Sequence, residues 1–209
     1  LGDMACHVLD GAWWSLRLDA AASYSVEIID ATDRNAYSFP AAQVLRYRFP
    51  ARADLGPVDV YWYDGHNVPP WPAGLPRSEE LGDGGELGAN DGAYFVGSEG
   101  LLTHGTYGNR PHLLPVSRME SYTKPAPSLP RIHRQNHYKN WVAACKGAEA
   151  ASSPFSYAGP FTIMVLLGAA AMRAGSALTW DAQQQRIAGD EALQALASRS
   201  YRDGWRLPL

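Results

Sequence analysis

The sequence is poor in cysteine and in long apolar runs, and each shortage excludes a class of protein. Its 209 residues include two cysteines, Cys6 and Cys145, too few for a disulfide framework. Both lie in apolar segments, where a buried thiol is the expected arrangement. No uninterrupted run reaches the ~18 apolar residues that span a bilayer, and no basic segment followed by an apolar one opens the chain. We therefore expect no disulfide scaffold, no membrane span and no secretory signal, while the compartment, cytoplasmic or periplasmic, stays open.

Positive charge is also scarce. The formal net charge is −3, and the chain has only three lysines, Lys124, Lys139 and Lys146. Without an excess of basic residues, a nucleic-acid-binding surface is not expected. Leu1 is not an initiator methionine, so we expect the chain to be part of a longer protein. With 46% hydrophobic residues, positions 1–209 suit one globular domain.

A dinucleotide fingerprint is missing as well. The glycine-rich stretch from Gly82 to Gly88 superficially resembles a phosphate-binding loop. No apolar strand precedes this stretch and no helix-like segment follows it, and both are needed to hold a pyrophosphate. The excursion from His66 to Asn90, rich in proline and glycine, is instead expected to be a long surface loop that either binds something or forms a flap.

Hydrophobic periodicity predicts an α+β domain: a mostly antiparallel open sheet of roughly six strands, with helices packed on one face. Strands are expected at Ser25–Ile29, Gln43–Phe49, Val58–Tyr63, Ala93–Val96, Gly100–Thr103, Gly105–Tyr107 and Leu178–Trp180. Helices are expected at Asp3–Leu16, His137–Lys146, Pro160–Arg173 and Glu191–Arg199, and residues 201–209 are expected to pack back as a tail.

The first helix carries a possible acid–base pair. At ~100° per residue, Asp3, His7, Asp10 and Trp14 fall on one stripe of the helix. A carboxylate one turn from an imidazole can fix its tautomer and stabilise its charged form, as general acid/base catalysis requires. On spacing alone, a solvated pair with Asp3 as the N-cap is the commoner arrangement.

Motifs along the whole chain resemble one known family. Residues 2–10, Gly-Asp-Met-Ala-Cys-His-Val-Leu-Asp, resemble the Asp-x-x-x-His motif that opens the C-terminal domain of the Gfo/Idh/MocA oxidoreductases, in their bacterial branch that is often secreted. Matching segments follow in the same order as in that domain: Val60–Gly65, Thr106–Gly108, Leu113–Pro115, His137–Trp141, Ala144–Gly147, Ser152–Pro160, Val165–Gly168, Leu178–Asp181 and Tyr201–Trp205.

The resemblance implies the substrate-binding and catalytic half of an NAD(P)-dependent oxidoreductase that acts on a sugar or polyol hydroxyl. The histidine that matches His7 takes the substrate proton, and the carboxylate that matches Asp3 assists. NAD or NADP is bound mainly by an N-terminal Rossmann domain that this chain lacks, so the isolated chain is expected to be inactive. None of its lysines lies in the Glu-Lys-Pro motif of that domain. Members usually pair their sheets, so a homodimer or larger homo-oligomer is expected.

Aromatic and polar residues supply candidates for binding the substrate. Flat apolar faces combined with planar or charged hydrogen-bonding groups suit a hydroxylated ring, although ordinary core and loop packing also uses such residues. The substrate-binding candidates are Trp14, Trp62, Tyr63, Asp64, Tyr107, Arg110 and Tyr157. No metal site is expected, because His104, His112, His133 and His137 form no tight ligand pair with Cys, Asp or Glu on one element.

Two departures from the family pattern leave the substrate open. Ile163 stands where related sequences commonly have an acid after Gly-Pro, and Ser156 stands where they often have Asp. Two other functions remain alternatives. A carbohydrate lyase or hydrolase that retains NAD would use the same His7 and Asp3, and would differ by showing no net cofactor reduction. A non-catalytic carbohydrate-binding or assembly domain would keep the core pattern but leave the His7 stripe facing solvent.

Overall fold

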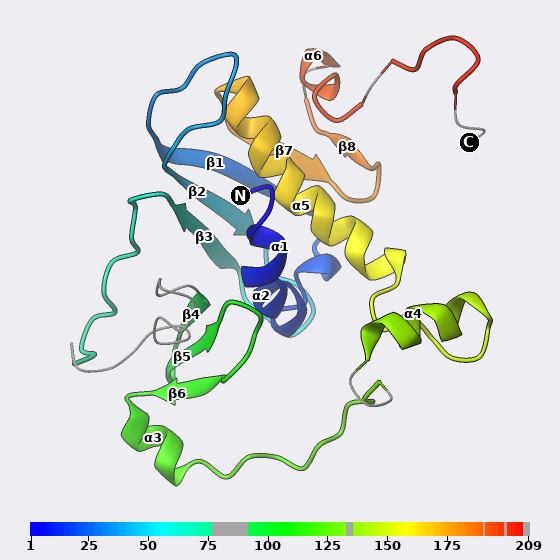
Figure 1. The fold of residues 1–209 in the computed structure, drawn as a ribbon. Helices are drawn as coiled ribbons and strands as arrows, with labels where there is room; N and C mark the ends of the chain where they lie inside the picture. Colours follow the sequence, from blue (N-terminus) through cyan, green and yellow to red (C-terminus); the bar gives the residue numbers. More distant parts are fainter. Residues whose placement is uncertain (77–91, 133–135, 190, 199, 207–209) are drawn as a thin grey trace.

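A five-stranded antiparallel sheet forms the centre of the molecule (Figure 1). The structure is a computed structural model that describes residues 1–76, 92–132, 136–189, 191–198 and 200–206. The strand order is β3-β2-β1-β7-β8. These strands are β1 (Ser23–Ala31), β2 (Gln43–Phe49), β3 (Val58–Asp64), β7 (Leu178–Asp181) and β8 (Arg186–Ile187). The α+β class with an open sheet, predicted from periodicity, is thereby confirmed.

Alternating side chains give this sheet one apolar face and one face that carries its charged residues. In β2, Leu45 and Tyr47 are fully buried, whereas Arg46 and Arg48 lie on the opposite face. The pattern repeats in β3, where Val60 and Trp62 point inward and Tyr61 points out. Because successive side chains of a strand point to opposite faces, one sheet face becomes core and the other stays open.

The long helix α5 (Phe155–Ala174) covers the apolar face by packing across β1 and β7 (Figure 1). It begins five residues earlier than predicted, because Pro154 rather than Pro160 stands at its N-cap in an extended conformation. Pro160 is accommodated inside the helix. Gly175 ends the helix in the left-handed conformation at φ 71°, as the sequence indicated.

By length and apolar composition alone, α5 could cross a membrane, although polar residues such as Ser156 and Thr162 interrupt its apolar run. Its 20 residues carry no charge before Arg173. Core helices of globular domains pass the same test. Seven residues of α5 are buried in the core cluster or beside it, including Met164 and Val165, and this packing accounts for its composition.

The predicted first helix is present but broken at Leu9 into α1 (Ala5–Val8) and α2 (Asp10–Ser15). Backbone hydrogen bonds continue across the break, from Leu9 N to Ala5 O at 2.9 Å and from Trp13 N to Leu9 O at 2.8 Å. A 3-10 turn, η1 (Leu18–Ala20), then leads into β1. The buried stripe of this segment packs against α5, where the Trp13 and Phe161 rings stack at 5.5 Å.

A second, three-stranded sheet was not separated from the first in the sequence prediction. It comprises β4 (Gly92–Gly97), β5 (Gly100–Gly105) and β6 (His112–Leu114), followed by α3 (Val116–Ser121). Residues 105–107, expected to be a strand, form the end of β5 and a turn instead. A three-residue strand and a six-residue helix in a proline-punctuated stretch are too short to show periodicity, so β6 and α3 were missed.

The remaining helices are peripheral. α4 (His137–Cys145) buries only Asn140, whose side chain bonds to Glu149, Ala150 and Ser152. α6 (Glu191–Gln194) is shorter than predicted. The prediction that the tail packs back is wrong for residues 201–206, which are all exposed and lead away from the body (Figure 1).

One close contact joins the small sheet to the first helices. The buried His104 ring of β5 lies against Gly11 of α2, so that a Cβ at position 11 would lie 2.5 Å from His104 Nε2. His104 Nδ1 is 2.7 Å from the Gly105 carbonyl oxygen, and this hydrogen bond fixes the ring in place. Gly11 is therefore required by packing rather than by backbone conformation.

We predict that Gly11→Ala destabilises the fold by about 1–3 kcal/mol, because the added methyl overpacks a buried ring. Helix propensity alone would give the opposite sign, a gain of up to about 1 kcal/mol. Urea denaturation measures the difference in the free energy of unfolding. Gly159→Ala in α5 is the matched control, since no atom lies within 4 Å of its added Cβ, and it should be neutral or stabilising. Equal stability of Gly11→Ala and the parent protein would contradict this packing.

Candidate functional site

The structure brings two of the predicted site residues together, His7 on α1 and Tyr107 in the turn after β5. Their ring centroids are 5.3 Å apart with an interplanar angle of 74°, an edge-on contact. Both side chains are exposed, Tyr107 to 64%. The turn that carries Tyr107 is closed by hydrogen bonds between Gly105 and both Gly108 and Asn109. An imidazole bounded on one side by an aromatic ring and open on the other can exchange a proton with a molecule in the opening.

Asp3 does not join this pair in the structure. It lies exposed in the turn before α1, and no hydrogen bond connects it to His7 within residues 1–76. The helix begins at Ala5 with Met4 as its N-cap, so the expectation that Asp3 is the N-cap is wrong. The assisting role that the family resemblance implies for Asp3 stays a prediction.

Of the other two residues on the helical stripe, Trp14 is exposed and Asp10 is hydrogen-bonded inside the fold. Trp14 is 56% exposed on α2 and offers an open aromatic surface. Asp10 accepts a hydrogen bond from the Tyr157 hydroxyl at 2.5 Å, which ties the first turn of α5 to α2. Burial, and then the hydrogen bond to Asp10, raises the pKa of Tyr157. Tyr157 therefore stays protonated at neutral pH, with its donor engaged inside the protein.

Trp62, Tyr63 and Asp64 cannot line one pocket, because neighbours in β3 point to opposite faces. Trp62 is 6% exposed on the core side, and its indole N–H donates to Asp64 Oδ2 at 2.7 Å. Tyr63 lies on the open face beside Tyr61, with ring centroids 6.2 Å apart. Because Trp62 and Tyr63 lie on opposite faces of β3, the three residues cannot all contact one substrate, as the sequence-based grouping assumed.

Asp64 is the centre of an internal hydrogen-bond network. Its carboxylate accepts two hydrogen bonds from Gln43, from the backbone N at 3.0 Å and from Nε2 at 2.8 Å, and one from Trp62 Nε1. The amino nitrogen of Leu1 donates a fourth hydrogen bond, at 3.2 Å. Burial raises the pKa of Asp64, but these hydrogen bonds outweigh the burial, so its pKa lies below the usual range. The network joins the ends of β2 and β3 and leaves Asp64 fully engaged within the fold.

Arg110 lies in the same loop as Tyr107, between β5 and β6. Its backbone adopts a left-handed conformation at φ 51°, and its carbonyl oxygen lies 2.9 Å from His112 Nδ1. Its side chain is exposed. The loop from Gly105 to Arg110 thus carries two of the predicted substrate-binding residues on one turn.

His104 was predicted only as an ordinary surface or core histidine, and the structure gives it a more specific position. It is 4% exposed, and its Nε2 has no hydrogen-bond partner among the described residues. His104 lies three positions before Tyr107, while Gly11, which it contacts, is one helical turn from His7. His104 therefore supports the junction that carries the His7–Tyr107 contact, and nothing in the sequence pattern of β5 indicated this.

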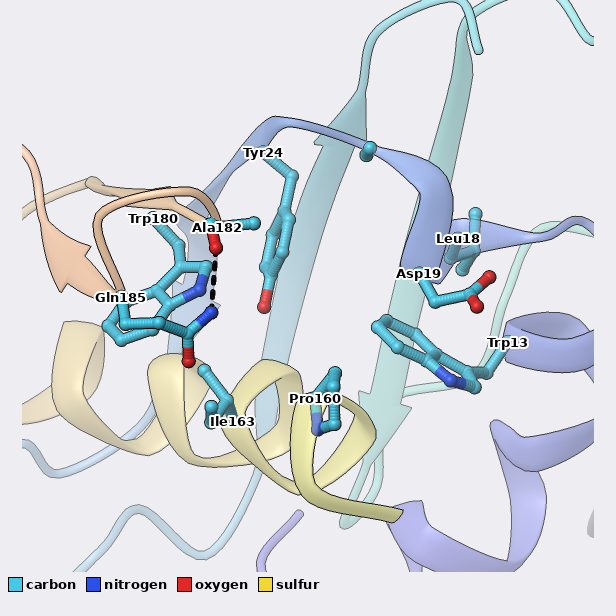
Figure 2. Close-up of a pocket in the computed structure, with 10 residues that line it drawn as sticks. Trp13, Leu18, Asp19, Tyr24, Pro160, Ile163, Trp180, Ala182 and Gln185 are labelled. Carbon is cyan, nitrogen blue, oxygen red and sulfur yellow. Dashed lines mark hydrogen bonds between the residues drawn. The ribbon is translucent and has the colours of Figure 1, made fainter. Parts of the chain in front are cut away.

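His7 and Asp3 line neither of two cavities formed by described residues. One, of about 190 Å³, lies beside Trp13 on another side of the first helices (Figure 2). The other, of about 420 Å³, lies between β1 and the residues after α5. No group of three potential metal ligands occurs within the described residues; His133 and the glycines at 82–88 lie outside them.

The Asp64 network predicts a specific pH dependence of stability. Asp64→Asn should lower the free energy of unfolding by about 1–3 kcal/mol at neutral pH, because an amide N–H₂ would face groups that are themselves donors. The folded-state pKa is depressed, so the contribution is full above the unfolded value and is lost as pH falls through the folded value. The difference between parent and variant in urea denaturation should therefore shrink below about pH 3.8. A difference independent of pH would contradict the assignment.

A scan against protein-family models found no match for this chain, and searches of curated proteins and of solved structures found none either. The resemblance to the Gfo/Idh/MocA oxidoreductases therefore rests on the motifs of the sequence. What that resemblance implies about activity belongs to the proposal that follows.

Proposed function

We propose that residues 1–209 are the substrate-binding and catalytic half of an NAD(P)-dependent oxidoreductase that acts on a sugar or polyol, with His7 as the general acid/base. The observation that supports this most directly is the exposed His7 imidazole in edge-on contact with Tyr107. No hydrogen bond within the described part of the chain occupies the imidazole, so it is free to accept a proton from a substrate hydroxyl.

The described residues do not fit a dinucleotide. They include no glycine-rich turn that leads from a buried strand into a helix, which is the arrangement that holds a pyrophosphate. The proposal therefore assigns NAD or NADP to a separate N-terminal domain, where a bound nicotinamide would supply the hydride acceptor. This chain would contribute the proton acceptor, His7, and an aromatic wall from Tyr107 and Trp14.

A non-catalytic binding or assembly domain is the second candidate, and the exposure of the stripe that carries His7 and Trp14 favours it. An exposed stripe fits either a catalytic surface that a partner domain covers or a docking surface of a non-catalytic domain. If substitution of His7 abolishes turnover, the catalytic function is supported over the non-catalytic one. A redox-neutral lyase or hydrolase would share the dependence on His7 and would show product without net reduction of NAD(P).

In a protein that carries both this chain and its dinucleotide-binding domain, His7→Ala should lower kcat by ~10²-fold or more, the usual scale for loss of a general base. Affinity for NAD(P) should be nearly unchanged. Asp3→Asn should cause a smaller loss, because Asp3 does not contact His7 in this conformation. Steady-state kinetics with a panel of sugars and polyols measures both effects.

The matched control is His137→Ala, which removes an exposed imidazole on the peripheral helix α4. It should leave kcat at the parental value. Wild-type kcat in the His7→Ala protein with every substrate accepted would show that His7 is not the base and would leave the assembly domain as the better proposal.

We further propose that the open face of the large sheet pairs with a second copy of the chain. No described helix covers this face (Figure 1). It displays Ile29 and Tyr61, 49% and 42% exposed, around an ion-pair cluster in which Glu27 contacts Arg46 and Arg48. A face that combines apolar and alternating charged groups is self-complementary across a two-fold axis, which is the commonest symmetry of homo-oligomers.

Light scattering should give twice the monomer mass of 22.8 kDa, or a higher even multiple. Ile29→Asp adds a carboxylate at an exposed position near the end of β1 and should shift the species toward monomer. Val96→Asp is the control, since Val96 is a β-branched strand residue on β4 of the small sheet and, at 73%, is even more exposed than Ile29. A strict monomer at high concentration, for this chain and for the protein with its partner domain, would overturn the proposal.

A further inference from the structure

The helix α4 is attached to the rest of the chain by one polar residue and not by an apolar face. Asn140 is 5% exposed, and its side-chain amide donates hydrogen bonds to the Ala150 carbonyl oxygen at 3.0 Å and to Glu149 Oε1 at 3.1 Å. Its side-chain oxygen accepts a hydrogen bond from Ser152 N at 2.8 Å. Because Asn140 is the only buried residue of α4, these bonds determine which side of the helix faces the chain.

The side of α4 away from Asn140 is a stripe of apolar residues that faces solvent. Spacings of three and four residues place three side chains on one face of the helix, those of Tyr138, Trp141 and Val142. They are 75%, 68% and 42% exposed. An amphipathic helix of a globular protein normally turns such a stripe toward the core, so α4 has the reverse orientation.

The shortness of α4 makes this orientation unfavourable for a helix that nothing covers. It has nine residues, fewer than the ~12–15 below which an isolated helix is marginal in water. Most helices in proteins are stabilised by packing of their apolar face. In α4 the bonds of Asn140 and the N-cap Asn136, whose side chain accepts from Lys139 N at 2.9 Å, take the place of that packing. The stripe therefore has the character of a surface that another body covers.

The charges beside the stripe are positive. Lys139 and Lys146 are seven residues apart, so they lie on the same flank of the stripe, and both are exposed. Within the described part of the chain, no ion pair engages either ammonium group. Helix α4 contains no acidic residue, and residues 116–150 carry six basic and two acidic residues in a chain whose formal net charge is −3. The body that covers the stripe is therefore expected to be anionic.

The kinds of residue in the stripe indicate a lipid surface. Tryptophan and tyrosine are enriched at the boundary between a bilayer and water, because their rings are apolar at one end and polar at the other. Lysines beside them extend their charged ends to the headgroups. Phe155, the first residue of α5 and 93% exposed, adds a third aromatic ring. Figure 1 shows α4 and the start of α5 together at the periphery, away from both sheets.

We propose that α4 attaches the protein to the surface of an anionic bilayer. Tyr138, Trp141 and Val142 enter the headgroup layer, and Lys139 and Lys146 contact lipid phosphates. The helix lies on the surface and does not span the bilayer. The surface includes none of the residues of the His7 site, so the proposal does not rest on the proposed function.

The test is co-sedimentation of the whole chain with vesicles. One set contains three parts phosphatidylcholine to one part phosphatidylglycerol, which is anionic, and the other contains phosphatidylcholine alone. The partition coefficient should be at least about ten-fold higher for the anionic vesicles, and added salt should lower it, because salt screens the attraction between lysines and lipid phosphates.

Trp141→Ser should lower the partition coefficient for anionic vesicles by about ten-fold or more, because a large aromatic side chain no longer enters the headgroup layer. Trp205→Ser is the matched control, since Trp205 in the C-terminal tail is also 68% exposed, and it should bind like the parent protein. Both side chains are exposed, so neither change should alter the free energy of unfolding, which urea denaturation verifies.

The double variant Lys139→Glu, Lys146→Glu should reduce binding to anionic vesicles to the level seen with phosphatidylcholine alone. Its control is the double variant Arg34→Glu, Arg202→Glu, which changes the net charge equally at exposed positions outside α4. This control should keep at least half of the parental binding, since its substitutions lie outside the attached surface.

Three results would overturn the proposal. The first is equal binding of the parent protein to the two kinds of vesicle. The second is equal loss of binding in a variant and its matched control. The third is self-association without lipid, measured by light scattering, that Trp141→Ser abolishes while Trp205→Ser does not. That result would assign the stripe to a contact with a second copy of the chain.

Discussion

The close approach of α5 to the apolar face of the large sheet is the constraint on which the other features depend. Gly168 of α5 lies against Tyr47 of β2, so closely that a Cβ at position 168 would overlap the Tyr47 hydroxyl oxygen. The helix can therefore sit directly above the strand, and the large residues Met164, Val165 and Leu167 fill the space around this contact. Burial raises the pKa of Tyr47, so that its phenol stays neutral in the core.

The position of α5 determines where the first helices lie. Trp13 stacks on Phe161, and Asp10 accepts the hydrogen bond of Tyr157, so α2 is attached to the first half of α5 by one apolar and one polar contact. The opposite side of the same segment, at Gly11, receives His104 of the small sheet. A short helical segment fixed on both sides in this way presents its remaining stripe, with His7 and Trp14, to solvent. A side chain that transfers protons needs such a rigid support.

The sequence was sufficient for most of the large sheet because burial on one face imposes strict alternation. The bounds predicted for β2 agree with the structure. The start of α5 was misplaced, because two prolines, Pro154 and Pro160, each suit a helix start and only tertiary packing selects between them. Similarly, Asp3 has a side chain that suits an N-cap, but the helix begins one residue later, with Met4 at that position and no side-chain hydrogen bond to the cap.

Residues that gather across the fold were harder to predict. Tyr24, Trp13 and Trp180 come from three segments separated by up to 167 positions of the chain, and no local pattern distinguishes them from core aromatics. Their arrangement follows from β1 pairing with β7, which places Tyr24 opposite Trp180, and from α5 closing over both strands. Tyr24 also stacks on Phe49, and Trp13 stacks on Phe161. The cavity that these residues line is thus a consequence of strand pairing and helix position, which explains why it becomes visible only once the chain is folded.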